Sequence, residues 1–156
     1  MTETPAAPGT DDYAVQWLNT LIVSTLDSAD NFEKAAGLAR NPRFQGLFKQ
    51  RAESRRKLAE DLKPEVRSFG AEPWEKGSFR GLAQRTFLEL RDKIGGKTDK
   101  PVIEAMERED DFIANQFAEA AHDDQLPEQA RQAVERAQEA LQTEHDQMLA
   151  IRNEFD

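Results

Sequence analysis

Apolar residues recur at steps of three, four and seven positions along most of the chain, which is the spacing of a helix with one buried face. This pattern predicts four long helices, over residues 11–41, 42–66, 101–121 and 126–155. The first helix ends where Asn41 precedes a proline, because such a residue disfavours the helical conformation. Asn41 can then cap the second helix, with the proline in its first turn. No stretch shows the alternating pattern of a strand.

A shorter apolar stretch lies between the second and third of these long helices. Its inward positions predict one short helix, with Phe79, Leu82, Phe87, Leu90 and Ile94 on one side. The whole connection, residues 69–100, is too long for a tight turn, so we interpret it as a crossover that makes the long helices on either side of it parallel. The sequence therefore predicts an all-α fold, a ferritin-like four-helix bundle with a short extra helix in the long crossover.

Length and composition narrow the classes of function. The 156 residues correspond to one domain, in which we expect residues 1–10 to be a disordered tail and residues 11–156 to form the bundle. A net charge of −9 argues against nucleic-acid binding, which needs a basic surface. No uncharged stretch is long enough to span a bilayer, and the first residues lack the features of a signal peptide. We therefore expect a cytoplasmic protein that binds neither nucleic acid nor membrane.

Several short motifs share their order and spacing with a known family. They are Leu18-Asn19-Thr20-Leu21-Ile22, Asp27, Phe32-Glu33-Lys34-Ala35-Ala36, Arg55, Leu58-Ala59-Glu60-Asp61-Leu62, Glu107-Arg108-Glu109-Asp110, His145-Asp146, Met148, Ile151 and Arg152. Over about residues 13–152 the chain resembles a bacterial ferritin-like family catalogued as a domain of unknown function. Glu109 and Asp110 stand where that family has Gly and Glu. The resemblance implies a ferritin-like bundle and no reaction, because the family has no assigned activity.

Four polar residues fall on the predicted inward faces, namely Glu33, Arg55, Asp110 and His145. At 1.5 Å of rise per residue, they lie within a turn or two of one level in the bundle. We interpret them as an internal ion-pair layer in which Arg55 partners both carboxylates, because a buried carboxylate needs a partner. The alternative is an iron or manganese site made by Glu33, Asp110 and His145, since carboxylate and imidazole groups suit these metals.

The bases and acids are unevenly distributed along the chain. Residues 40–57 contain seven bases and one acid, whereas residues 101–125 contain eight acids and one base. This asymmetry fits attraction within one bundle, or between two subunits. We expect a non-enzymatic interaction or stress-associated protein that forms a homodimer and needs no cofactor. The sequence does not identify a small-molecule ligand. The alternative function is a metalloprotein that binds or oxidises iron or manganese in its core.

Overall fold

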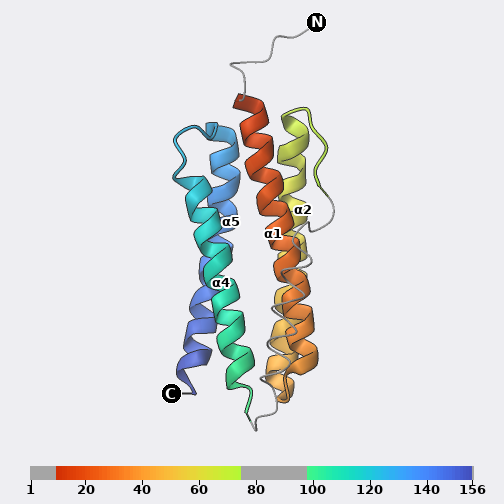
Figure 1. The fold of residues 1–156 in the computed structure, drawn as a ribbon, viewed down its shortest axis with the longest axis vertical. Helices are drawn as coiled ribbons and strands as arrows, with labels where there is room; N and C mark the ends of the chain where they lie inside the picture. Colours follow the sequence, from red (N-terminus) through yellow and green to blue (C-terminus); the bar gives the residue numbers. More distant parts are fainter. Residues whose placement is uncertain (1–9, 75–97, 156) are drawn as a thin grey trace, which may run out of the picture.

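A computed structural model describes residues 10–74 and 98–155 of the chain. These residues form four helices and no strand (Figure 1). The helices are α1 (Thr10–Leu38), α2 (Pro42–Ser68), α4 (Lys100–Ala121) and α5 (Glu128–Asn153). The predicted all-α four-helix bundle is therefore confirmed, with helix bounds within a few residues of those expected. The expected disordered tail, except for Thr10, and the expected short crossover helix lie outside the described residues.

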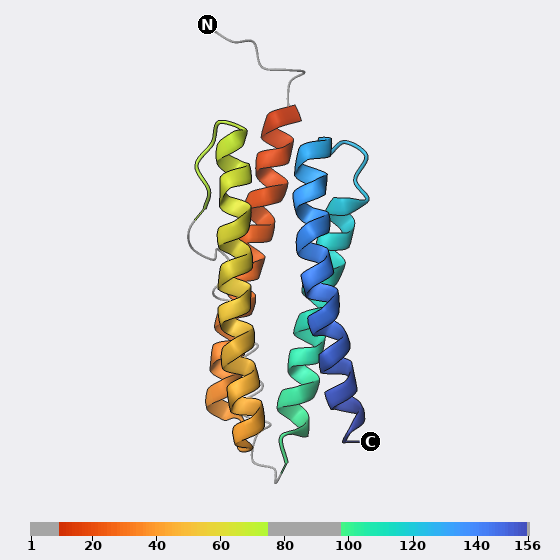
Figure 2. The same ribbon diagram turned by 180° about the vertical axis from the view of Figure 1, so that it is seen from behind.

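The four helices are arranged as two antiparallel hairpins. Hairpin one consists of α1 and α2, hairpin two consists of α4 and α5, and the closest packing lies within each hairpin. Figures 1 and 2 show that α2 and α4 run in the same direction, as the predicted crossover requires. Hairpin two meets hairpin one mainly through α1 and α4, while α2 and α5 approach each other less closely.

Local chemistry accounts for the ends of α2. The side chain of Asn41 caps its N-terminus, because Asn41 Oδ1 accepts a hydrogen bond of 2.9 Å from the Arg43 backbone amide. The helix continues through Pro64 and is followed by Gly70, which has a φ of +84°. Glycine tolerates this left-handed conformation, so the chain can turn sharply away from the helix there.

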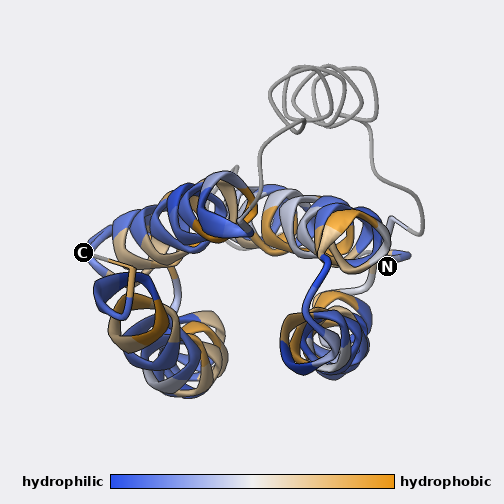
Figure 3. Cartoon of the chain, turned by 90° about the horizontal axis from the view of Figure 1, so that it is seen from below, coloured by the Kyte–Doolittle hydropathy of each residue, from blue (hydrophilic) through white to orange (hydrophobic). Residues whose placement is uncertain are grey.

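The interior of the bundle contains two apolar clusters. The upper cluster is formed by residues from the start of α1, the end of α2, the end of α4 and the first part of α5, among them Leu18, Leu62, Phe117 and Leu141. The lower cluster contains residues from the opposite ends of the same helices, among them Phe32, Phe48 and Met148. Each helix carries hydrophilic and hydrophobic residues around its circumference (Figure 3). Within the described ranges, none of the helices is long and apolar enough to cross a membrane.

Candidate functional site

Arg55 lies in the centre of the bundle, between the two apolar clusters. Its side chain is 1% exposed although guanidinium groups normally lie at the surface. It donates hydrogen bonds of 2.7 Å to Ser28 Oγ on α1, 2.7 Å to Asp110 Oδ1 on α4 and 3.1 Å to Glu144 Oε1 on α5. One guanidinium of α2 therefore contacts all three other helices.

A second buried arginine lies one turn earlier on α2. Arg51 is 3% exposed, and its Nη1 lies 3.5 Å from Asp110 Oδ2. Its Nε lies 3.6 Å from Glu144 Oε2, and Nη2 donates to Gln147 Oε1 at 3.0 Å. Burial lowers the pKa of Arg51. Both arginines also lie near the Phe32 ring, with guanidinium carbons 5.8 Å (Arg51) and 5.1 Å (Arg55) from its centroid.

Three carboxylates complete this part of the core. Asp110 is 2% exposed, and burial raises its pKa although two guanidinium groups act in the opposite direction. Burial also raises the pKa of Glu109, which accepts a 2.9 Å hydrogen bond from Asn31 Nδ2. Glu144 of α5 is the third. We call Arg51, Arg55, Glu109, Asp110 and Glu144 the central charged layer.

The structure brings together two of the four residues that the sequence placed in an inward layer. Arg55 and Asp110 form the expected ion pair. The prediction that Arg55 pairs with Glu33 is wrong, because the Glu33 side chain is 59% exposed and its Oε2 lies 3.1 Å from Arg56 Nη2. The inward stripe of α1 passes through Ser28 and Phe32, each 0% exposed, so the residue after Phe32 is turned towards solvent.

His145 also lies outside the central charged layer. Its side chain is 21% exposed, and Nε2 lies 2.5 Å from Asp111 Oδ1 on the neighbouring helix α4. The preceding residue, Glu144, turns towards Arg55 instead. Glu33, Asp110 and His145 are therefore not brought together. The described residues contain no group of three or more histidine, cysteine or carboxylate side chains placed to hold a metal ion.

Sequence reasoning missed three members of the layer, Arg51, Glu109 and Glu144. A signal existed for Arg51, because residues four apart lie on the same helix face and Arg55 was already placed inward. Glu109 and Glu144 are direct neighbours of residues that were chosen, and a helical pattern with two adjacent polar residues cannot decide whether one or both of them face the core. The partners on other helices decide it.

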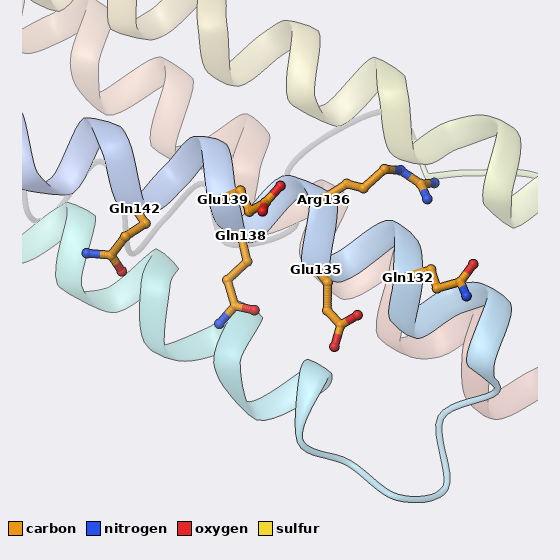
Figure 4. A pocket seen from close by; sticks show the side chains of 6 residues that line it. All are labelled: Gln132, Glu135, Arg136, Gln138, Glu139 and Gln142. Carbon is orange, nitrogen blue, oxygen red and sulfur yellow. The ribbon is translucent and has the colours of Figure 1, made fainter.

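Among the described residues, two hollows on the surface lie away from this layer. The larger, about 600 Å³, lies on the outer face of α5 and is lined by Gln132, Glu135, Arg136, Gln138, Glu139 and Gln142 (Figure 4). These side chains all come from one helix and none of them is hydrophobic or aromatic, whereas such side chains predominate in a typical ligand pocket. The other, about 380 Å³, lies at the lower end of the bundle beside Phe44, Asp99 and Phe155.

Comparison with protein families adds one assignment. Residues 13–123 match a family described as a domain of unknown function, DUF2383. The chain belongs to this family. No curated protein and no solved structure matches the chain. The matched range contains most of α1 and all of α2 and α4, with Arg55 and Asp110, and it ends before α5, which supplies Glu144.

Proposed function

We propose that this DUF2383 protein is a non-enzymatic, ferritin-like helical bundle of the bacterial cytoplasm that acts by binding other proteins in a stress-associated role. The observation that supports this proposal is the position of Arg55. Its guanidinium lies at the centre of the bundle, where a metal-binding bundle gathers carboxylates around a cation. Here the positive charge comes from the chain itself.

Within the central charged layer, both guanidinium groups are paired with carboxylates of the chain. Arg51 and Arg55 face Asp110 and Glu144 at distances between 2.7 and 3.6 Å. Buried ion pairs contribute little net stability compared with apolar side chains, but breaking one partner is costly. Such a layer therefore favours one arrangement of the helices, and it leaves binding of partners to the surface.

The alternative function is an iron or manganese protein that uses Glu33, Asp110 and His145. In this alternative, Glu33 and His145 must turn inward from exposed and partly exposed positions, and a metal must displace Arg55 from Asp110. Each of these changes opposes a contact present in the bundle. We therefore propose that the protein acts without a cofactor, and we propose no small-molecule ligand for it.

Metal analysis distinguishes the two functions. The untagged protein is loaded with iron, manganese or zinc without oxygen, desalted and assayed for bound metal. We expect less than about 0.1 metal per chain, and no oxygen consumption after ferrous iron is added. Stoichiometric metal that disappears in Asp110→Asn, but stays in the exposed control Glu119→Gln, would overturn the proposal and support the metalloprotein.

We also propose that the protein forms a homodimer and binds no nucleic acid. The support is the separation of charge between hairpins, together with a net charge of −9 that disfavours phosphate backbones. Sedimentation velocity over a range of protein concentrations tests the dimer, and a purely monomeric protein contradicts it. Addition of short duplex DNA in the same experiment should leave the sedimentation of the protein unchanged.

A further inference from the structure

The lower end of the bundle has a hollow in which side chains from three parts of the chain meet. Figure 1 shows the end of α1, the starts of α2 and α4 and the end of α5 at this end of the molecule. The hollow has a volume of about 380 Å³. We call it the lower hollow, and its lining residues are Arg40, Asn41, Phe44, Thr98, Asp99 and Phe155.

Hydrogen bonds within the chain hold the polar part of the lower hollow in place. The buried Asp99 carboxylate accepts from the backbone amides of Arg40 at 2.8 Å and Asn41 at 2.9 Å. Asn41 Oδ1 accepts from the Arg43 amide at 2.9 Å. Thr98 Oγ1 accepts from the backbone amide two residues further on, at 3.4 Å. Each side-chain oxygen that lines the hollow therefore already accepts a hydrogen bond within the protein.

The groups that remain at the rim of the lower hollow are donors. The Arg40 side chain is exposed, and among residues 10–74 and 98–155 its guanidinium has no ion pair and no hydrogen bond. The side-chain amide nitrogen of Asn41 likewise donates to no other described residue. A guanidinium carries five N–H donors, a positive charge and no acceptor. The group that complements these donors and this charge is a carboxylate.

The acids close to the lower hollow are already paired. Asp99 is 6% exposed and faces the two amides described above. Glu154 has both side-chain oxygens bound to the Arg43 guanidinium, at 2.8 and 2.9 Å. Residues 40–44, 98–100 and 152–155 together contain four bases and two acids, although the whole chain has a net charge of −9. This end of an acidic molecule is therefore suited to an anionic group.

Aromatic rings form the apolar side of the lower hollow. The ring centroids of Phe44 and Phe155 are 5.9 Å apart, and the guanidinium carbon of Arg43 lies 5.1 Å from the Phe44 centroid. Phe155 is partly exposed, so a side chain from another molecule can reach it. Arginine and aromatic residues are enriched among the residues that dominate binding in protein interfaces. The lower hollow presents both kinds on one concave surface.

We infer that the lower hollow is a docking site for a protein partner, and that it takes an acidic segment in which a carboxylate side chain lies next to an aromatic or aliphatic one. The carboxylate pairs with Arg40 and accepts from the Asn41 amide, while the apolar side chain packs against Phe155. A basic segment is opposed by the charge of Arg40. This inference rests on the proposed function, which is binding of other proteins, and it names the chemistry of the partner.

Titration of the full chain with a capped peptide tests the inference. The probe is acetyl-Glu-Phe-Glu-amide, and its matched control is acetyl-Gln-Phe-Gln-amide, which has nearly the same shape without the charges. Binding is followed by the backbone amide shifts in NMR spectra. We expect saturable shifts among residues 40–44 and 98–100 with the acidic peptide. The control peptide should bind about three- to tenfold more weakly, because it lacks the charge-assisted hydrogen bonds.

Substitutions separate a specific site from general attraction of charge. Arg40→Gln keeps the backbone amide that Asp99 binds, and it should weaken binding of the acidic peptide about three- to tenfold. Lys49→Gln removes the same charge from an exposed residue of α2 that does not line the hollow, and it should leave binding nearly unchanged. Phe155→Ala should also weaken binding, because it removes the partly exposed ring.

Four results would overturn the inference. Absence of shifts at the lower hollow, or equal binding of the two peptides, excludes recognition of a carboxylate. Equal losses in Arg40→Gln and Lys49→Gln show general attraction of charge. Sodium benzoate that binds as tightly as the acidic peptide assigns the hollow to a small anion. Shifts of the same amides when the protein is diluted without peptide assign it to a second copy of the chain.

Failure of this inference is distinguishable from failure of the proposed function. If the acidic peptide does not bind, the proposed function stands, because a protein partner can bind another surface. Stoichiometric metal in the analysis described above overturns the proposed function whether or not the peptide binds.

Discussion

Arg55 and Asp110 lie on the diagonally opposed helices α2 and α4, and their side chains meet at 2.7 Å in the centre of the bundle. Each is at most 2% exposed. Because α2 and α4 run parallel, this pair fixes their relative height. The apolar clusters above and below it consist largely of Ala, Leu, Val and Ile side chains, whose non-directional contacts specify alignment less strictly.

The first prediction concerns the loss of one partner of this pair. Arg55→Met keeps much of the side-chain volume but leaves Asp110 buried without its closest cation. We expect the free energy of unfolding to fall by about 3 kcal/mol or more, as for other broken buried pairs. Urea unfolding at neutral pH measures the change. The matched control is Arg56→Met, which removes the same charge from the next residue along the helix. Because the Arg56 side chain is 41% exposed, this substitution should change the free energy of unfolding by less than about 1 kcal/mol.

The double variant Arg55→Met/Asp110→Leu extends this prediction. It removes both charges and leaves Arg51 with Glu144, whose charged groups approach to 3.6 Å between Nε and Oε2. We expect stability to return close to that of the unchanged protein. If the single variant at Arg55 is as stable as the unchanged protein, the ion pair has no structural role. If the double variant is as unstable as the single one, the cost does not come from the unpaired Asp110.

The sequence predicted the helices and the parallel crossover because these depend on local signals. Asn41 and Pro42 mark a helix boundary by their own conformational preferences, and the apolar spacing marks each buried face. The composition of the central layer depends on contacts between helices. Glu33 and His145 were placed inward because apolar residues lie three and four positions away. The actual inward positions, Ser28 on α1 and Glu144 on α5, are set by hydrogen bonds from Arg55.

The second prediction concerns Glu109 and pH. Burial raises the pKa of Glu109 in the folded state, so folding disfavours its ionised form. The unfavourable contribution is absent below the ordinary glutamate pKa of about 4.3, grows as the pH rises from there to the higher folded pKa, and is constant above it. Glu109→Gln should therefore stabilise the protein at neutral pH, and this gain should disappear towards pH 4. The introduced amide oxygen can still accept the hydrogen bond from Asn31.

Unfolding midpoints in urea between pH 4 and pH 8 measure this effect. The control Glu33→Gln removes a carboxylate with a 59% exposed side chain, so its effect on stability should stay small across the range. A Glu109→Gln variant that is less stable than the unchanged protein at pH 7 would mean that ionised Glu109 is stabilised by Arg55 more than it is opposed by burial.

The third prediction concerns Asp99, which the sequence analysis did not single out. Its side chain accepts hydrogen bonds of 2.8 Å from the Arg40 amide and 2.9 Å from the Asn41 amide, and Asp99 is 6% exposed. It therefore ties the turn between α1 and α2 to the start of α4. Asp99→Ala removes both acceptors and should lower the free energy of unfolding by about 1 to 3 kcal/mol. Asp99→Asn keeps one acceptor oxygen, so its free energy of unfolding should lie between those of the unchanged protein and of Asp99→Ala. Equal stability of all three proteins in urea unfolding would contradict this role.

The fourth prediction concerns the upper end of the bundle, where Asp123 holds the start of α1. Asp123 Oδ2 accepts hydrogen bonds from Tyr13 Oη and, at 3.0 Å, from Trp17 Nε1. The hydrogen bond from Tyr13 is the main cause that lowers the pKa of Asp123, followed by the one from Trp17. Because the folded pKa is below the usual value for aspartate, the contact contributes stability above about pH 4 and loses it as the pH falls through the folded pKa.

Hydrogen exchange resolves this contact from the rest of the molecule. Asp123→Ala should speed amide exchange in the first turns of α1, around Tyr13 and Trp17, because a helix end that loses its tertiary contacts frays locally. Exchange around Arg55 should stay slow, since the central charged layer is unchanged. The neighbouring variant Asp124→Ala changes an exposed residue and should leave both regions as they are. Uniformly faster exchange along the whole of α1 would instead indicate that Asp123 supports global stability, and unchanged exchange at Tyr13 would show that its hydrogen bond does not hold the helix end.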